Sequence, residues 1–236
     1  MGSLKEVIRI DRFISNATTL SRSQAQRVIR AGRVRVDGVQ IKQASFSVRL
    51  DAEVYLDGSI VAPPLPRYFM LNKPLGVVSA AHDPSHRTVL DLFDLPNPTA
   101  LHIAGRLDID SSGLVLVTDD GHWSHRITAP SNHCPKTYAV TLAEPLTAGQ
   151  VAKLEAGLLL KGEARPTKPA GVEQLSALEL RLTITEGRYH QVKRMFAALG
   201  NHVQALHRLS IGGLLLDPSL LPSEYRALTP QEVALF

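Results

Sequence analysis

Three prolines fall within the four residues 63–66 of this chain of 236 residues. Proline fixes the backbone angle φ and donates no backbone hydrogen bond, so such a run favours an extended, semi-rigid connector over a helix or a central strand. The sequence therefore predicts a small amino-terminal module over residues 1–62, a linker over residues 63–67 and a larger domain over residues 68–236.

Basic residues are concentrated in the smaller module. Residues 1–64 carry ten Lys and Arg against six Asp and Glu, whereas residues 65–236 carry sixteen of each, so the whole net charge of +4 lies in the first part. Clustered positive charge on a small module is typical of proteins that bind the phosphate backbone of nucleic acids. A surface kept basic for solubility is the alternative, but it does not explain why the remainder is neutral.

Two short helices are predicted at the start of the small module. Apolar residues recur at helical spacing over residues 10–17. A second helix should begin at Ser21, because Gln24 lies three residues later and completes a capping box, and Gly32 fits its carboxyl-terminal end.

A small sheet should follow these helices. Apolar residues alternate through residues 34–36 into Asp37-Gly38, a strong signal for a hairpin turn, and Asp57-Gly58 repeats that signal. We expect this module to bind the phosphate backbone of a nucleic acid through its arginines: Arg9, Arg12, Arg22, Arg27, Arg30, Arg33 and Arg35.

The larger domain is predicted to mix strands and helices. Strands are expected over residues 68–72, 114–118, 137–142 and 178–184, and helices over residues 190–199 and from Pro230 onwards. Strands and helices do not alternate regularly, so the α+β class fits better than a doubly wound sheet.

The sequence also predicts a cellular setting. Cys134 is the only cysteine, so the chain suits a reducing compartment. Residues 1–9 lack the apolar core of a signal peptide, and no apolar run approaches the length of a membrane span. We therefore expect a cytoplasmic protein with no membrane partner, and we expect a monomer.

The stretch from Gly105 to Gly113 concentrates groups that could do chemistry. It carries Arg106, Asp108 and Asp110 directly before an apolar strand, and such a loop at the edge of a sheet is a common place for functional side chains. A carboxylate there can act as a nucleophile or a base. An isolated Asp in a glycine-containing loop more often only caps a turn, so this stretch alone decides nothing.

Two further stretches could contribute to a site. Residues 186–194 join a strand to a helix and carry three cations, although a solvated helix face is the more common explanation. Tyr138 enters a strand, where a tyrosine is usually core but can also stack on a nucleobase. The sequence has no HExxH motif, no GxSxG elbow, no Walker A loop and no GxGxxG, so it predicts neither a metal nor a cofactor.

Taken together, these stretches resemble one family. The segment LSRSQAQRVIRAGRVRVDG resembles an S4 RNA-binding domain. The segments RYFMLNKPLGVVS, HIAGRLDIDSSGLVLVTDDG, CPKTYAVTL, ITEGRYHQVKRMFAALGNHV and LHRLSIGG resemble, in order, the catalytic domain of RsuA-type pseudouridine synthases, which modify bacterial small-subunit (16S) ribosomal RNA. The resemblance implies an α+β catalytic domain with a mixed, mainly antiparallel sheet and flanking helices.

The resemblance also implies roles for four residues. Asp108 corresponds to the nucleophile of the family's GRLD motif, and Tyr138 to the tyrosine that packs against the target base. Lys193 matches the basic position that pairs with the catalytic carboxylate, where related synthases often have Arg. Arg106 should help to displace the target base.

The implied reaction suits these residues. A uridine inside a stacked helix must be flipped out before an enzyme can reach it, and a nearby cation keeps a carboxylate ionised for attack. Two alternatives remain: a large-subunit ribosomal RNA synthase of the same layout, and a non-catalytic RNA-binding assembly factor. A glycoside hydrolase is disfavoured because Asp108 and Asp110 are only two residues apart and aromatic residues make up 5% of the chain.

Overall fold

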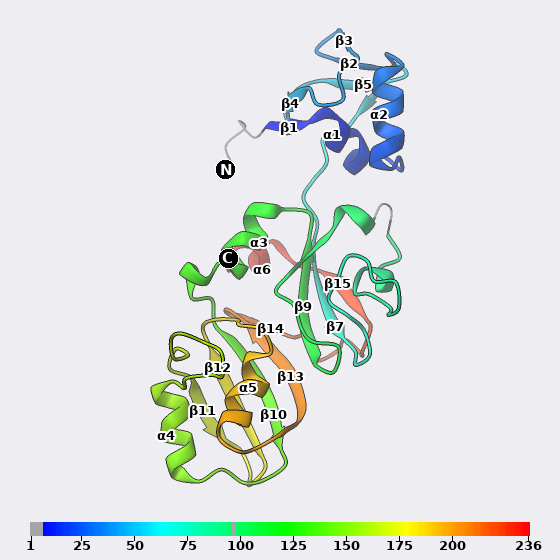
Figure 1. Cartoon of the computed structure of the whole chain (residues 1–236). Helices are drawn as coiled ribbons and strands as arrows, with labels where there is room; N and C mark the ends of the chain where they lie inside the picture. Colours follow the sequence, from blue (N-terminus) through cyan, green and yellow to red (C-terminus); the bar gives the residue numbers. More distant parts are fainter. Residues whose placement is uncertain (1–6, 96–97) are drawn as a thin grey trace. The chain divides into compact units, whose positions relative to one another are not determined.

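The computed structural model describes residues 7–95 and 98–236 (Figure 1). Contacts between Cα atoms divide the chain into two compact units. One comprises Met1–Pro66 with Asp94–Ala100, and the other comprises Arg67–Phe93 with Leu101–Phe236. Residues 1–6, which belong to the predicted amino-terminal module and to the stretch 1–9 tested for a signal peptide, lie outside the described residues.

In its described residues, the smaller unit contains two α-helices, one 3-10 turn and two small sheets. Strand β1 pairs with β4, and a four-stranded antiparallel sheet has the order β3-β2-β5-β6. Its elements are β1 (Val7–Arg9), α1 (Ile10–Ala17), α2 (Arg22–Arg30), β2 (Val34–Val36), β3 (Val39–Ile41), β4 (Ser47–Arg49), β5 (Val54–Leu56) and β6 (Ser59–Val61).

Local sequence signals account for these elements. Ser21 and Gln24 form the predicted capping box at the start of α2. Asp37 and Gly38 both have positive φ, 48° and 81°, as the two central residues of a tight hairpin turn require, and the Asp57-Gly58 turn of β5 and β6 repeats this geometry. The predicted helices and hairpins of this unit are therefore confirmed.

One charged residue, Asp11, lies in the core of the smaller unit. Its neighbours Ile10, Phe13 and Ile14 are fully buried, and so is the Asp11 side chain. Burial alone would raise the pKa of this carboxyl, but hydrogen bonds from Arg9, Gln26 and Arg22 outweigh it and lower the pKa to about 2. This buried carboxylate therefore ties the start of α1 to α2.

The larger unit is built on a nine-stranded mixed sheet with the order β11-β12-β10-β13-β9-β7-β15. Strand β14 pairs with β13, and β8 pairs with β9. The strands are β7 (Tyr68–Lys73), β8 (His102–Ala104), β9 (Ser112–Thr118), β10 (Lys136–Leu142), β11 (Gly171–Gln174), β12 (Glu179–Ile184), β13 (Val203–Ile211), β14 (Leu214–Leu215) and β15 (Tyr225–Ala227).

Helices lie against this sheet. Helix α5 lies over the part formed by β10, β12 and β13, and α4 lies beside β11 (Figure 1). The helices are α3 (Gly121–Thr128), α4 (Ala148–Ala156), α5 (Gln191–Ala198) and α6 (Pro230–Val233), and the 3-10 turns are η1 (Leu90–Leu92), η2 (Pro98–Ala100, assigned to the smaller unit) and η3 (Pro130–Asn132). Trp123 of α3 is fully buried in a core that includes Met70, Leu114 and Leu116.

The two parts of the sheet meet at a short parallel contact. Strand β9 pairs with β13 only through Ser112 and Gly113, opposite His207 and Arg208. Gly113 has φ of 103°, and a Cβ atom there would lie 2.4 Å from the Arg208 carbonyl oxygen. Glycine is therefore required at the position where the predicted catalytic loop joins the sheet.

The structure confirms the α+β class and the mainly antiparallel sheet. It also contains elements that the sequence patterns did not predict, notably α3, α4 and the nine-residue strand β13. Helix α5 begins at Gln191, one residue after the predicted start. Within the described part of the chain, every helix is too short or too polar to cross a membrane.

Candidate active site

The loop over residues 105–111 is anchored through its backbone. Ser79 Oγ donates to the Leu107 carbonyl at 2.7 Å and accepts from the Leu107 amide at 3.0 Å. The Gly76 amide donates to the Ile109 carbonyl at 2.8 Å. The loop is thus held in one conformation, as a group that must meet a substrate in a defined orientation requires.

Two buried cations complete this anchoring. Arg208 is 2% exposed and donates to the carbonyl oxygens of Leu114 (2.7 Å), Arg106 (3.2 Å) and Gly105 (2.8 Å). Lys73 is fully buried, and its Nζ donates to the carbonyl oxygens of three residues: Pro74 (3.0 Å), Asp108 (3.0 Å) and Ser111 (2.7 Å). Each cation therefore replaces its lost hydration with loop carbonyls.

The ionisation of Lys73 reflects this environment. Burial lowers the pKa of Lys73 to about 8, although the negative charges of Asp108 and Asp110 act in the opposite direction. The hydrogen bonds from Lys73 Nζ to the carbonyl oxygens of Asp108 and Ser111 hold the loop in place.

The Asp108 side chain points toward two residues of the 186–194 stretch. Its Oδ2 accepts a hydrogen bond from Lys193 Nζ at 3.0 Å, and its Oδ1 lies 3.4 Å from His190 Nε2. The Asp108 side chain is 28% exposed and the Lys193 side chain 25%. The structure thus brings together two predicted site residues that are far apart in the sequence.

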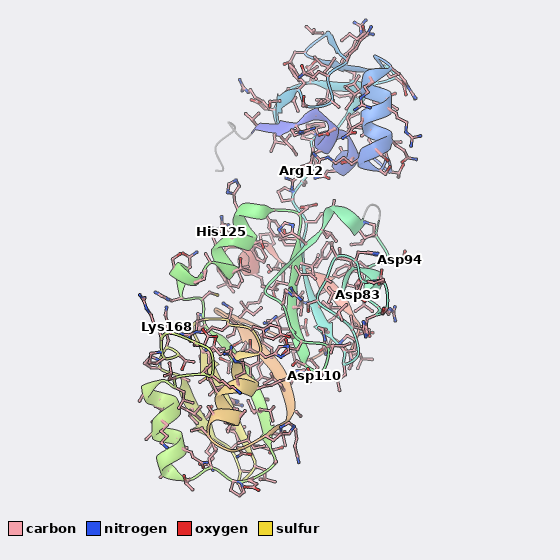
Figure 2. The ribbon with its side chains drawn as sticks, in the orientation of Figure 1. Arg12, Asp83, Asp94, Asp110, His125 and Lys168 are labelled. Atoms are coloured by element: carbon pink, nitrogen blue, oxygen red, sulfur yellow. The ribbon has the colours of Figure 1, made fainter. Side chains whose placement is uncertain are left out.

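Lys193 also pairs with Asp110, which Figure 2 labels near the junction of the two parts of the sheet. Burial lowers the pKa of the Lys193 ammonium, but hydrogen bonds to Asp110 and Asp108 outweigh it, so its pKa is raised. The same contact holds the pKa of the Asp110 carboxyl below its ordinary value. Asp110 is far more exposed than Asp108, at 66% of its side chain, so the two carboxylates occupy different environments.

Tyr138 and Arg106 line the same pocket, which has a volume of about 720 Å³. Tyr138 lies on β10 and is 7% exposed, with the Arg208 guanidinium 6.0 Å from its ring centroid. The Arg106 side chain is exposed, whereas its carbonyl is held by Arg208. All four predicted catalytic residues therefore border one pocket of a size that holds small ligands.

Three residues of this site were not predicted from the sequence: Lys73, His190 and Arg208. Arg208 gives no clear sequence signal, because it takes an inward position of β13 between buried Leu206 and Ser210 and there interrupts the apolar pattern of a strand. Lys73 ends an otherwise buried strand, which is also unusual for lysine. His190 gives no such signal, since its role depends on the left-handed conformation at φ of 48° before α5.

The seven predicted RNA-binding arginines are all exposed, but their surroundings differ. Arg9 and Arg22 hydrogen-bond to buried Asp11, and Arg33 forms an ion pair with Asp57. Arg27 and Arg30 lie one turn apart on α2, and within the described residues neither side chain has a hydrogen-bond or ion-pair partner. Arg35 donates to the Gly38 carbonyl, and Arg12 is exposed on α1 (Figure 2).

The described residues offer no group of three or more His, Cys, Asp or Glu side chains that could hold a metal ion. The chemistry available is that of an ionised carboxylate on a rigid loop, with a cation beside it and an aromatic ring in the same pocket. Such a carboxylate can attack an electrophilic carbon or stabilise a developing positive charge.

The chain as a whole is similar to known proteins. Residues 67–198 match the RNA pseudouridylate synthase family, and residues 8–61 match the S4 domain. The chain is 52% identical over 228 residues to ribosomal small subunit pseudouridine synthase A of Escherichia coli strain K12, which covers 96% of this chain and 99% of that protein. The protein of the same name from Haemophilus influenzae is 49% identical over 227 residues, covering 96% and 98%.

A solved structure gives the same result. The protein described as "Crystal structure of pseudouridylate synthase" is 48% identical, covers 97% of this chain and 100% of its own, and superposes with a TM-score of 0.71. The similarity therefore extends over both units and not only over the loop that carries Asp108.

Proposed function

The chain belongs to the RNA pseudouridylate synthase family, and from this premise we propose that it converts one uridine of small-subunit ribosomal RNA into pseudouridine, with Asp108 as the nucleophile. It is an RNA pseudouridine synthase by family. The near full-length identity to small-subunit synthases of two bacteria supports the choice of RNA. The observation that carries the proposed role of Asp108 is its carboxylate, fixed on an anchored loop and paired with Lys193 at 3.0 Å.

The reaction breaks the bond between uracil N1 and ribose C1′ and forms a bond from C5 to C1′; C5 loses its proton and N1 gains one, so the product is an isomer of the substrate. An ionised Asp108 attacks the flipped-out nucleoside, on the base or on the ribose, and holds the fragment while the uracil turns over. Lys193 Nζ, 3.0 Å from Asp108 Oδ2, orients this carboxylate and offsets its negative charge in a partly buried pocket. No electron transfer and no external group donor enter this balance.

Two further side chains act on the base in this proposal. The Tyr138 ring provides a surface for the uracil while it is detached, because nucleobases stack on aromatic rings with little dependence on sequence. Arg106 is exposed at the pocket, where its guanidinium can take the place of the flipped uridine or contact a phosphate.

The smaller unit anchors the RNA. We propose that residues 1–62 bind the RNA backbone through their exposed arginines, that residues 63–67 connect, and that residues 68–236 carry out catalysis. The match of residues 8–61 to the S4 domain and the basic charge of this part support that division. We further propose that the protein is a monomer and that it acts where ribosomes are made, in the cytoplasm.

The test is to map pseudouridine in small-subunit ribosomal RNA after incubation with the purified protein. Wild type should modify one uridine. Asp108→Asn preserves shape but removes the charge, so it should fold, bind the RNA and form no detectable product. Asp110→Asn is the matched control and should retain turnover, because Asp110 is the more exposed carboxylate.

Three results would contradict parts of this proposal. Product from Asp108→Asn would exclude it as the nucleophile. Pseudouridine formed only in large-subunit RNA would favour a large-subunit ribosomal RNA synthase of the same family. A wild-type protein that binds ribosomal RNA but modifies none would support a non-catalytic assembly factor.

A further inference from the structure

Tyr189 carries an aromatic ring that is unusually exposed for its position. Its side chain lies in the loop between β12 and α5 and is 77% exposed, although it borders the pocket that contains Asp108. Among the described residues, Phe46, at 38%, is the only other aromatic residue more than about a third exposed. Large apolar side chains at the rim of a polar pocket commonly mark a binding surface.

One face of the Tyr189 ring is covered by a second ring. It stacks on the His190 ring with centroids 3.8 Å apart and an angle of 19° between the planes. His190 is fixed in turn, since its Nε2 lies 3.4 Å from Asp108 Oδ1 and its backbone is held at φ of 48°. Arg194 Nη1 donates to the Tyr189 carbonyl at 3.1 Å. The other face of the Tyr189 ring, called its outer face here, is left open to solvent.

From this stack we infer a binding site for a second nucleobase. We propose that the outer face of Tyr189, supported by His190, stacks with the base adjacent to the target uridine in the RNA. The inference rests on the proposed function. When the target uridine is flipped out, its neighbour loses a stacking partner, and an exposed aromatic face beside the pocket replaces it.

The geometry separates this site from that of the target uridine. The inner face of the Tyr189 ring is covered by His190, and the edge of His190 faces Asp108. A base on the outer face is therefore separated from His190 by the whole thickness of the Tyr189 ring, so Asp108 does not attack it. Tyr138, on strand β10, remains the ring that we propose for the target uracil.

The experiment is a cycle that combines a protein change with an RNA change. The RNA is a fragment of small-subunit RNA that contains the uridine modified by wild type, with the base intact or removed from the nucleotide on its 5′ or 3′ side. Dissociation constants are measured for wild type and Tyr189→Ala. Removing one stacked base or its aromatic partner should weaken binding about 5- to 150-fold.

The expected result is coupling between the two changes. Wild type should bind one of the two abasic RNAs about 5- to 150-fold more weakly than the intact RNA, and Tyr189→Ala should bind intact and abasic RNA alike. Tyr189→Phe should restore the discrimination, because it keeps the ring. Leu215→Ala removes an exposed side chain (70%) outside the pocket and should leave the discrimination at the wild-type value.

The cycle also separates this site from indirect effects. If Tyr189→Ala acted only by releasing His190, intact and abasic RNA would be weakened equally and the two effects would add, which would overturn the inference. The same holds if wild type fails to discriminate between the RNAs while still forming pseudouridine. A wild type that forms no pseudouridine in any ribosomal RNA would overturn the proposed function, and this inference with it.

Discussion

Lys193→Ala is expected to slow the reaction without abolishing it. Lys193 Nζ donates to Asp108 Oδ2 at 3.0 Å, and both side chains are about three-quarters buried. This contact therefore contributes more free energy than an ion pair between exposed side chains. Hydrogen bonds to charged groups contribute about 1.5–3 kcal/mol. If that contribution orients the nucleophile in the transition state, its loss corresponds to a rate reduction of about 10- to 150-fold.

The contact with Asp110 sharpens this prediction. Lys193 bridges both carboxylates, so its removal leaves two like charges facing each other. Adding Asp110→Asn to Lys193→Ala should therefore restore part of the lost rate, and Lys193→Arg should retain more activity than Lys193→Ala because it keeps the charge.

The assay is single-turnover release of tritium from C5 of uridine in the RNA, because that hydrogen is lost when C5 joins the ribose. Melting curves and RNA affinity are measured on each variant to exclude unfolding and loss of binding. A Lys193→Ala rate within about twofold of wild type would refute the reasoning, since about 1.4 kcal/mol is a factor of ten. Complete loss of product with an intact fold would show that Lys193 takes part in the chemistry itself.

Three other perturbations test the remaining assignments. Replacing Arg27 and Arg30 together with Ala should weaken binding to many RNAs alike, and the slope of log affinity against log salt should shrink by roughly 0.7–0.9 for each lost phosphate contact; an unchanged slope would make them surface charges only. Tyr138→Phe should keep function, whereas Tyr138→Ala should lose on the order of 1–3 kcal/mol of base stacking, and full turnover by the Ala variant would contradict that role. Asp11→Asn should destabilise the smaller unit by about 2 kcal/mol at pH 7, because the pKa of Asp11 in the folded state, about 2, lies below its pKa in the unfolded chain. The difference in stability between wild type and variant should vanish as the pH falls through 2. Circular dichroism should detect the unfolding of the smaller unit, while the fluorescence of Trp123, in the other unit, does not change.

Local patterns predicted the elements whose determinants are contiguous in the sequence. The capping box at Ser21 and the Asp37-Gly38 turn act within a few residues, so they could be identified without tertiary information. Strand β13 was missed because its buried positions include Arg208, which interrupts the apolar alternation that defines a strand in a sequence. The burial of Arg208 becomes favourable only when its guanidinium donates hydrogen bonds to backbone carbonyl oxygens that are distant in the sequence.

In the candidate site, too, the sequence predicted what depends on neighbouring residues and missed what depends on distant ones. Asp108 could be singled out as a carboxylate in a glycine-bounded loop, but its spacing alone did not distinguish a nucleophile from a turn cap. The contact that joins it to Lys193 spans 85 residues of sequence, so it depended on the resemblance until the fold placed α5 beside the loop. Lys73 was overlooked because a charged residue at the end of a strand usually reaches solvent, and here it does not.

The larger unit carries a local excess of positive charge that its overall composition does not reveal. Residues 65–236 contain equal numbers of acidic and basic residues, which on its own argues against an electrostatic role for this part. Around the catalytic loop, however, Lys73, Arg208 and Lys193 oppose only two carboxylates, Asp108 and Asp110. Two of these cations are buried where solvent screens them little, so their field at the loop is stronger than that of exposed charges. The same backbone contacts that make the loop rigid therefore also place positive charge beside Asp108, so one set of interactions both stabilises the loop and supports the role proposed for Asp108.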